Sequence, residues 1–362
     1  MALGDFELIE ESFVKAAIDP SQWVKALDVV AAVTRSQGAV LLPVTGNMIS
    51  ALPFTESIAG SFDTYIRDEW YQRDERNRGI DILKRRGIVD DLDLFSEDEI
   101  KRHPYYQEFL APHGLRWFGG VRISCGTDLW CLSIQRRIDQ APFSQSEKDQ
   151  LAIPSKSLSG SAAIASAIGE SIGLGALEAF EISNRGAALI NRDGRIFKLN
   201  RIAEQLLKGD IRLVKGKIVA DDRAACEQFE RALGKLLNHP SSAIRPPIAF
   251  ERKGRRPLLA YPAKLDSLTR NALADCQVVV IFVDMEMLPR PPKATLQVGF
   301  QLSEAEARLA VHLADGEPLE KAADYLGVAK ETARSQLKSI FAKVGCHRQA
   351  ELVAILSMFL KG

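Results

Sequence analysis

Hydrophobic and polar residues show two periodicities along residues 1–154, one typical of helices and one typical of strands. Apolar residues recur at helical spacing after Ser21, a candidate N-cap, and then form an uninterrupted run typical of a buried strand. Two alternating runs further on flank the segment from Cys125 to Asp128, a pattern typical of a β-hairpin. The pattern predicts an α/β domain with a helix at 23–34, a strand at 38–44 and a hairpin at 120–135.

The middle of the chain changes pattern twice. Residues 155–179 are rich in Ser, Ala and Gly, with apolar residues at loosely helical spacing. They predict a connecting helix whose small residues allow close packing on a partner helix. Residues 180–286 then read as a strand, a turn with glycine, a second strand, a helix that Asn200 can cap, and two late strands. We expect an antiparallel sheet with helices in this region.

The last part of the chain is helical in pattern. Three prolines between residues 289 and 292 favour an extended linker over residues 287–294. Ser303 and Glu306 form a capping box at the start of the first helical pattern. A glycine, the residue that commonly ends a helix, follows each of the first three helical patterns. The spacing therefore predicts four short amphipathic helices within residues 295–362.

Composition and charge narrow the classes of function. The chain has 362 residues, of which 46% are hydrophobic and 26% charged, as expected of a multidomain globular protein. Its 47 basic residues balance 47 acidic ones, so any surface that binds a polyanion has to be local. Within residues 330–348, five basic residues stand against one acidic residue, Glu331. The third C-terminal helix therefore carries a basic face.

Other signals concern location and chemistry. The N-terminus lacks the basic-then-apolar order of a signal peptide, no run of eighteen apolar residues occurs, and the five cysteines show no CxxC spacing. We expect a cytoplasmic protein with free thiols and no membrane contact. The scattered histidines and the lack of GxSxG and GxxxxGK[ST] motifs predict no enzyme, no catalytic residue, no metal and no evident cofactor.

The C-terminal segment resembles the LuxR-type helix-turn-helix family, the group similar to NarL and FixJ. The resemblance rests on the runs Leu302–Glu306, Lys321–Val328, Glu331–Gly345 and Arg348–Leu352. It implies a four-helix domain that places its third helix in the major groove of double-stranded DNA. It also implies bases read by Arg334, Ser335 and Lys338, phosphates contacted by Lys330, Thr332 and Lys343, and a dimer contact at Leu352, Ile355 and Met358.

Two residues depart from that family pattern. Ala333 stands where a larger β-branched residue is usual, and Gln336 stands where a histidine is usual. Neither change removes the basic face of the helix. We expect them to alter the fit in the groove or the preferred DNA sequence.

The upstream regions resemble sensor domains. Residues 180–286 resemble a PAS domain, and residues 1–154 resemble a GAF or autoinducer-binding domain. Residues 113–116 precede the hairpin as the corresponding segment does in acyl-homoserine-lactone receptors. The aromatic and acidic residues of the predicted pocket, however, lie closer together in this sequence than in that family. We predict a pocket for an unidentified small molecule at Tyr65, Trp70, Tyr71, Asp74 and Trp117.

Two further interpretations concern the N-terminal region, one of the predicted pocket and one of a possible phospho-receiver site. The tryptophans, together with Phe118, would equally serve as core aromatic residues. The acidic pair Asp90 and Asp91 is interpreted as a solvated turn, because no phospho-acceptor context surrounds it.

The sequence thus predicts an α+β multidomain transcriptional regulator. Its parts are a GAF-like or autoinducer-binding-like sensor (1–154), a connecting helix (155–179), a PAS-like domain (180–286), a Pro-rich linker (287–294) and an all-α helix-turn-helix domain (295–362). It would bind DNA as a homodimer under the control of a small-molecule effector, with RNA polymerase as a further candidate partner. The alternative is a sensory or protein-interaction module that keeps the helical fold without binding DNA.

Overall fold

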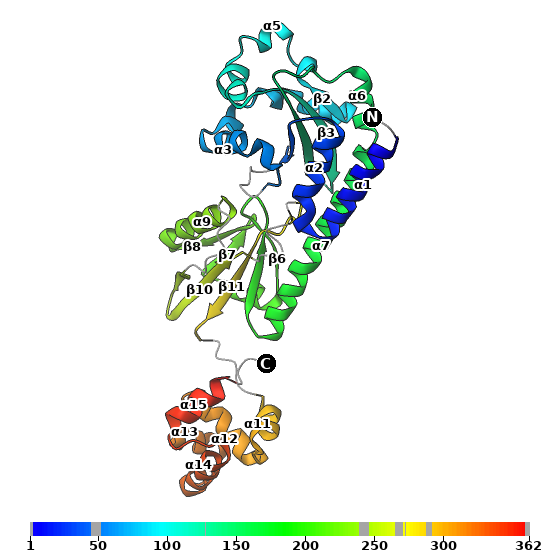
Figure 1. The fold of residues 1–362 in the computed structure, drawn as a ribbon. Coiled ribbons are helices and arrows are strands. Elements are labelled where there is room, and N and C mark those ends of the chain that lie inside the picture. The colour runs from blue at the N-terminus through cyan, green and yellow to red at the C-terminus, as the bar shows by residue number, and fades with distance from the viewer. Residues whose placement is uncertain are drawn as a thin grey trace.

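The structure is a computed structural model that describes residues 3–44, 52–126, 128–238, 246–264, 271, 273–286 and 292–358. It is a mixed α+β fold in which the paired strands are antiparallel and helices cover the sheets (Figure 1). The α+β class predicted from the sequence is therefore confirmed.

The N-terminal domain is built on a four-stranded antiparallel sheet in the order β1-β4-β3-β2. Its strands are β1 (Gly38–Pro43), β2 (Ile88–Asp90), β3 (Leu115–Cys125) and β4 (Asp128–Arg137). The predicted buried strand and the predicted hairpin are thereby confirmed. The accompanying helices are α1 (Leu3–Ile18), α2 (Trp23–Val33), α3 (Ala59–Arg67), α4 (Ile80–Arg86), α5 (Glu97–Ile100) and α6 (Gln145–Ala152).

The predicted cap of α2 is wrong. The carboxylate of Asp19 accepts a hydrogen bond from the backbone N–H of Ser21 at 3.0 Å, and a short 3₁₀ turn over Pro20–Gln22 precedes the helix. No side chain caps α2 itself at Gln22. Ser21 therefore belongs to the turn that leads into the helix, and it is the Asp19 side chain that caps this turn.

The connecting helix α7 (Ser155–Ile182) is confirmed and packs on both sheets. Its inward face is buried, and the amide of Asn271 in the central domain donates to the carbonyl of Ala165 at 2.7 Å. A Cβ at Gly169 would lie 2.3 Å from the Cβ of Ala274, so glycine is needed there for the close approach. Because α7 contacts β3 and β5, it joins the first two domains into one unit.

By length and composition alone, the helical stretch Gln145–Ile182, which includes α6 and α7, could cross a membrane. This finding differs from the expectation of no membrane contact, which rested on the lack of an unbroken run of eighteen apolar residues.

The central domain contains a five-stranded antiparallel sheet in the order β6-β5-β11-β10-β9. The side chain of Asn200 accepts a hydrogen bond from the N–H of Ala203, so the predicted cap is confirmed. The elements are β5 (Gly186–Ile190), β6 (Ile196–Leu199), α8 (Arg201–Leu206), β7 (Ile211–Val214), β8 (Lys217–Ala220), α9 (Arg223–Asn238), β9 (Ile248–Arg252), β10 (Arg255–Ala263) and β11 (Val278–Asp284). Strands β7 and β8 pair separately as a hairpin.

The C-terminal helices surround a hydrophobic core of their own. They are α11 (Lys293–Phe300), α12 (Glu304–Ala314), α13 (Leu319–Leu326), α14 (Lys330–Val344) and α15 (Gln349–Met358). The four predicted helices are confirmed, and the predicted capping box at Ser303 is present. Helix α11 begins inside the predicted linker, whose residues 287–291 lie outside the described residues.

Candidate ligand cavity and nucleic-acid interface

A cavity of about 380 Å³ lies within the N-terminal domain. Strands β1 and β4 form one wall, and a π-helical turn over Tyr105–Leu110 contributes three lining residues. Such turns occur frequently at functional sites. The apolar lining includes Val40, Leu42, Phe62, Leu83, Leu110 and Leu115, and the polar lining includes Tyr65, Tyr71, Asp74, Ser133 and Gln135.

Asp74 is the acidic residue of this cavity. Its Oδ2 accepts a hydrogen bond from the Tyr65 hydroxyl at 2.8 Å, and its Oδ1 accepts one from the N–H of Arg76 at 2.9 Å. Burial raises the pKa of Asp74, against the lowering effect of the Arg76 guanidinium and of the Tyr65 and Tyr105 hydroxyls. The carboxyl group is thus fixed in position at the edge of an apolar space.

A buried ion pair supports the same wall of the cavity. The Nε of Arg76 lies 2.9 Å from Oδ1 of Asp91, and its Nη1 donates to Oε1 of Gln135 at 3.1 Å. Asp91 also accepts from the Tyr106 hydroxyl and the N–H of Phe118, both at 2.6 Å. Every member of this network has a partner, as a buried charge requires.

This network corrects the interpretation of the acidic pair. Asp90 and Asp91 are 2% and 1% exposed, so they do not form a solvated turn. Asp90 instead caps a 3₁₀ turn and pairs with Lys148 at 3.2 Å. The local pattern does not indicate that this pair is buried, because Arg76, the partner of Asp91, lies on a separate turn.

The structure places three of the five predicted pocket residues at the cavity: Tyr65, Tyr71 and Asp74. Trp70 and Trp117 do not line it. The ring of Trp70 stacks on Phe109 with centroids 5.3 Å apart, and the indole N–H of Trp117 donates to the carbonyl of Gln140 at 2.9 Å. Both tryptophans are core residues, as the alternative interpretation held.

Sequence reasoning missed Ser133 and Gln135. The amide of Gln135 donates to the Ser133 hydroxyl at 2.8 Å, and both residues point from β4 into the cavity wall. The alternation along β4 was the available signal, since Ser133 and Gln135 stand on either side of Ile134 after the apolar run 129–132.

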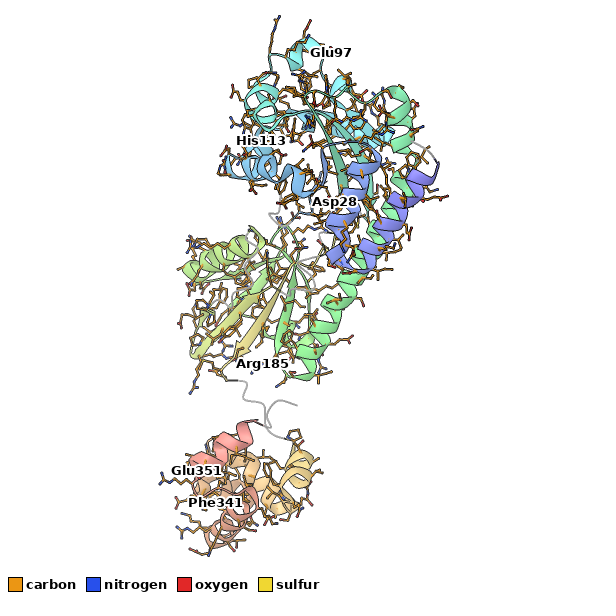
Figure 2. The ribbon with its side chains drawn as sticks, viewed as in Figure 1. Asp28, Glu97, His113, Arg185, Phe341 and Glu351 are labelled. Carbon is orange, nitrogen blue, oxygen red and sulfur yellow. The ribbon has the colours of Figure 1, made fainter. Side chains whose placement is uncertain are left out.

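The C-terminal domain presents a helix-turn-helix. Helices α13 and α14 are joined by a tight turn at Gly327, whose φ of 66° lies in the left-handed region that favours glycine. The predicted DNA-facing side chains of α14 are all exposed, at Lys330, Thr332, Arg334, Ser335 and Lys338. Phe341, further along α14, packs against the core (Figure 2).

One departure from the family pattern has a structural explanation. Ala333 is fully buried in the core between the helices. The departure at this position therefore changes the packing of α14 rather than the surface that would face DNA.

Ion pairs divide the predicted contact residues into two groups. Arg334 pairs with Glu331 at 2.9 Å and Lys330 with Glu320 at 3.3 Å, and the four side chains are exposed. Such pairs contribute about 0 to 1 kcal/mol and exchange readily for phosphate. Lys343 is different, because its Nζ binds the largely buried carboxylate of Glu306 at 2.6 Å.

Glu306 is an anchor between α12 and α14. It also accepts hydrogen bonds from the Ser339 hydroxyl and the N–H of Ser303, both at 2.6 Å. Burial would raise the pKa of Glu306, but the hydrogen bonds from Lys343 and Ser339 outweigh it and lower the pKa to about 2. Lys343 is thereby committed to holding α14 against α12.

The predicted dimer contact needs correction. Leu352 is 0% exposed and belongs to the core of its own domain, so it has no surface to offer a second copy. Ile355 is half-buried against the same core. The side chain of Met358 lies outside the described residues.

Among the described residues, no group of three or more His, Cys, Asp or Glu side chains gathers as a metal site.

Cys125 and Cys131, the two cysteines of the β3–β4 hairpin, do not face each other across it. In the register of the hairpin, Cys131 pairs with Arg122 and Cys125 with Asp128.

No protein-family model and no curated protein sequence matches this chain. Among solved structures, a phage VqmA–DPO complex is 16% identical, covering 54% of this chain and 92% of that one, with a TM-score of 0.25. The Vibrio cholerae VqmA dimer, described with LuxR-type receptors, is 11% identical over 52% and 93%, with a TM-score of 0.22. The E. coli DhaR(N)–DhaL complex is 10% identical over 78% and 90%, with a TM-score of 0.21. Likeness at this level defines no family and no function.

Proposed function

We propose that this chain is a DNA-binding transcription regulator of the LuxR type, controlled by a small molecule in the N-terminal cavity. The observation that carries the proposal is the exposed face of α14 behind the tight turn at Gly327, where Arg334 and Lys338 stand one turn apart with Ser335 next to Arg334. A helix presented in this way fits the major groove, and arginine and lysine are the side chains that most often contact guanine. In this proposal Lys330 and Thr332, both exposed at the start of α14, bind phosphates.

A titration of the full chain on DNA tests this proposal. Duplexes selected by the wild-type protein from a random pool would be labelled, and binding would be followed by fluorescence anisotropy. Arg334→Ala is expected to lower the affinity about 5- to 150-fold, the equivalent of about 1 to 3 kcal/mol. Affinity should fall steeply between about 50 and 200 mM salt.

The matched control is Arg231→Ala, which removes an exposed arginine of α9 that is also paired with a glutamate of its own helix. It should bind DNA as the wild type does. An absence of DNA binding at low salt, or equal losses in both variants, would refute the proposal.

The cavity supports the second half of the proposal. Its volume falls within the range of about 300 to 1,000 Å³ typical of ligand pockets, and its walls combine apolar side chains with polar ones that include Arg76 and Asn77. The fixed carboxyl of Asp74 suits a ligand that donates a hydrogen bond, and the apolar part of the lining suits an uncharged body. The effector we propose is therefore a small neutral molecule with one hydrogen-bond donor.

Native mass spectrometry of protein purified from its host tests this assignment. A retained small molecule is expected with the wild type and with Asp63→Asn, an exposed carboxylate on α3. It should be lost or weakened in Asp74→Asn. Retention that does not differ between the two variants would show that Asp74 is no part of a binding site.

One observation favours a different function. The C-terminal domain has 8 basic and 8 acidic residues within 295–362, and three of its cations are paired with carboxylates. A neutral helical domain of this kind suits a protein-interaction module. The DNA titration decides between the two, because only a DNA-binding domain gives a steep salt dependence with selected duplexes.

A further inference from the structure

Helix α7 has two apolar faces, of which the domains use one. Figure 1 shows this long helix along one side of both domains. The inward residues pack on the sheets, as described above. On the opposite side lies a second row, which we call the outer stripe: Ser157, Gly160, Ile164, Ala167, Ser171 and Leu174, all exposed.

The outer stripe has the spacing of a helix-pairing seam. Its positions alternate three and four residues apart over residues 157–174, the repeat that two helices need to keep their contact in register. Ile164 is 48% exposed and Leu174 is 37% exposed, and both lie on this repeat. In the part of the chain that the structure describes, α1 and the two sheets pack on α7, and the outer stripe stays exposed.

Two glycines strengthen this reading. A Cβ at Gly160 or at Gly175 would meet no other atom within 4 Å, so the packing of this chain does not require glycine at either position. Glycine weakens a helix interior, and it is favoured where another backbone approaches closely. An incoming helix supplies that approach.

Charge identifies the occupant as a second copy rather than a lipid surface. Between Lys156 and Glu178 the helix carries a single charged residue, Glu170, so two copies can meet without repulsion along the central turns. A helix that lies on a membrane surface carries several lysines or arginines on its polar face, and α7 has only Lys156. The face is thus compatible with itself.

We propose that the outer stripe of α7 binds the same stripe of a second copy of this chain. The proposal goes beyond DNA binding, because the contact needs neither DNA nor the C-terminal domain. The outer stripe spans residues 157–174, hence a length of about 27 Å, and at a helix width of about 10 Å each copy contributes roughly 270 Å². An interface of about 540 Å² in total belongs to the weak, reversible class.

Sedimentation velocity of the full chain over a range of concentrations tests the proposal. The wild type is expected to shift from monomer to dimer as concentration rises. The double variant Ile164→Glu/Leu174→Glu should stay monomeric at concentrations where the wild type is dimeric, with unchanged circular dichroism because both side chains are exposed. Val219→Glu changes a similarly exposed apolar residue on β8, 40% exposed, and should dimerise like the wild type.

Cross-linking adds a readout of position. In a Cys226→Ser background the remaining native cysteines are buried, so Ala167→Cys should form a disulfide-linked dimer under mild oxidation and Val219→Cys should not. A monomeric wild type, a dimer that survives the double variant, or binding of the wild type to anionic vesicles through α7 would each overturn the proposal. Loss of the dimer with DNA binding intact would leave the DNA-binding function untouched.

Discussion

At the scale of single residues, the Arg76–Asp91 pair is the feature whose loss should cost the N-terminal domain most. The side chains are 7% and 1% exposed, and removing one partner leaves a buried charge unpaired. Arg76→Ala is therefore expected to lower the free energy of unfolding by about 3 to 5 kcal/mol. The four tryptophans lie within residues 23–130, so urea unfolding followed by tryptophan fluorescence reports this domain.

The control for that measurement is Arg137→Ala. It removes an equally close pair with Asp139, at 2.7 Å, whose side chains are more than half exposed. That change should cost about 0 to 1 kcal/mol. Similar losses in the two variants would contradict the role assigned to burial.

Glu306 gives a residue-scale prediction for pH. Its pKa is about 2 in the folded domain, below its ordinary value of 4.5. The stabilisation is thus complete above pH 4.5 and is lost as the pH falls from 4.5 towards 2. Glu306→Gln should remove about 1.5 to 3 kcal/mol of local stability at neutral pH.

Hydrogen–deuterium exchange of α14 checks this prediction. The variant should exchange faster than the wild type at pH 7, and the difference should shrink at pH 3. Glu304→Gln, an exposed carboxylate in the same first turn of α12, serves as the control and should change little. A difference that persists unchanged at pH 3 would be inconsistent with the lowered pKa.

At the scale of elements, local signals predicted well and long-range signals did not. The hairpin β3–β4, the Asn200 cap and the capping box at Ser303 follow from neighbouring residues, and the structure confirms them. Helix α1 was missed because its contacts are divided between the neighbouring α2 and α7, which lies more than a hundred residues away.

The candidate site divides in the same way. Tyr65 and Asp74 lie close in sequence and were predicted together, and they share a hydrogen bond. Gln135 was missed because the contact that places it, with Arg76, spans 59 positions. Leu352 was misassigned because the family resemblance implies a dimer contact on the fourth helix but does not show which of its residues face their own core.

An interdomain contact supplies an element-scale prediction. Arg192, in the turn between β5 and β6, lies 3.2 Å from Asp128 on β4 and 4.5 Å from the ring centroid of Trp130. The arginine is buried, so its loss should free both elements. Arg192→Ala is expected to raise deuterium uptake in the β3–β4 hairpin of the neighbouring domain.

Arg195 provides the control in the same turn. Its guanidinium donates to the carbonyl of Lys215, inside the central domain. Arg195→Ala should therefore leave the β3–β4 hairpin unchanged. Equal uptake in that hairpin for both variants would mean that Arg192 does not hold the domains together.

At the scale of the whole molecule, the neutral C-terminal domain limits how tightly one copy can hold DNA. Residues 295–362 have no net charge, and Lys343 is committed to Glu306, so a single domain offers few free cations. Two copies joined through α7 would bind paired half-sites together, because the first contact raises the effective concentration of the second domain. The dimer contact would then determine affinity without touching DNA.

This coupling is open to a direct measurement. Ile164→Glu/Leu174→Glu should weaken binding to a selected duplex with two half-sites at least about tenfold. Its affinity for a duplex with one half-site should match that of the wild type, since α14 is unchanged. Val219→Glu should bind both duplexes normally. Equal losses on both duplexes would locate the defect in the DNA-binding domain itself, and unchanged binding to both would separate dimerisation from DNA recognition.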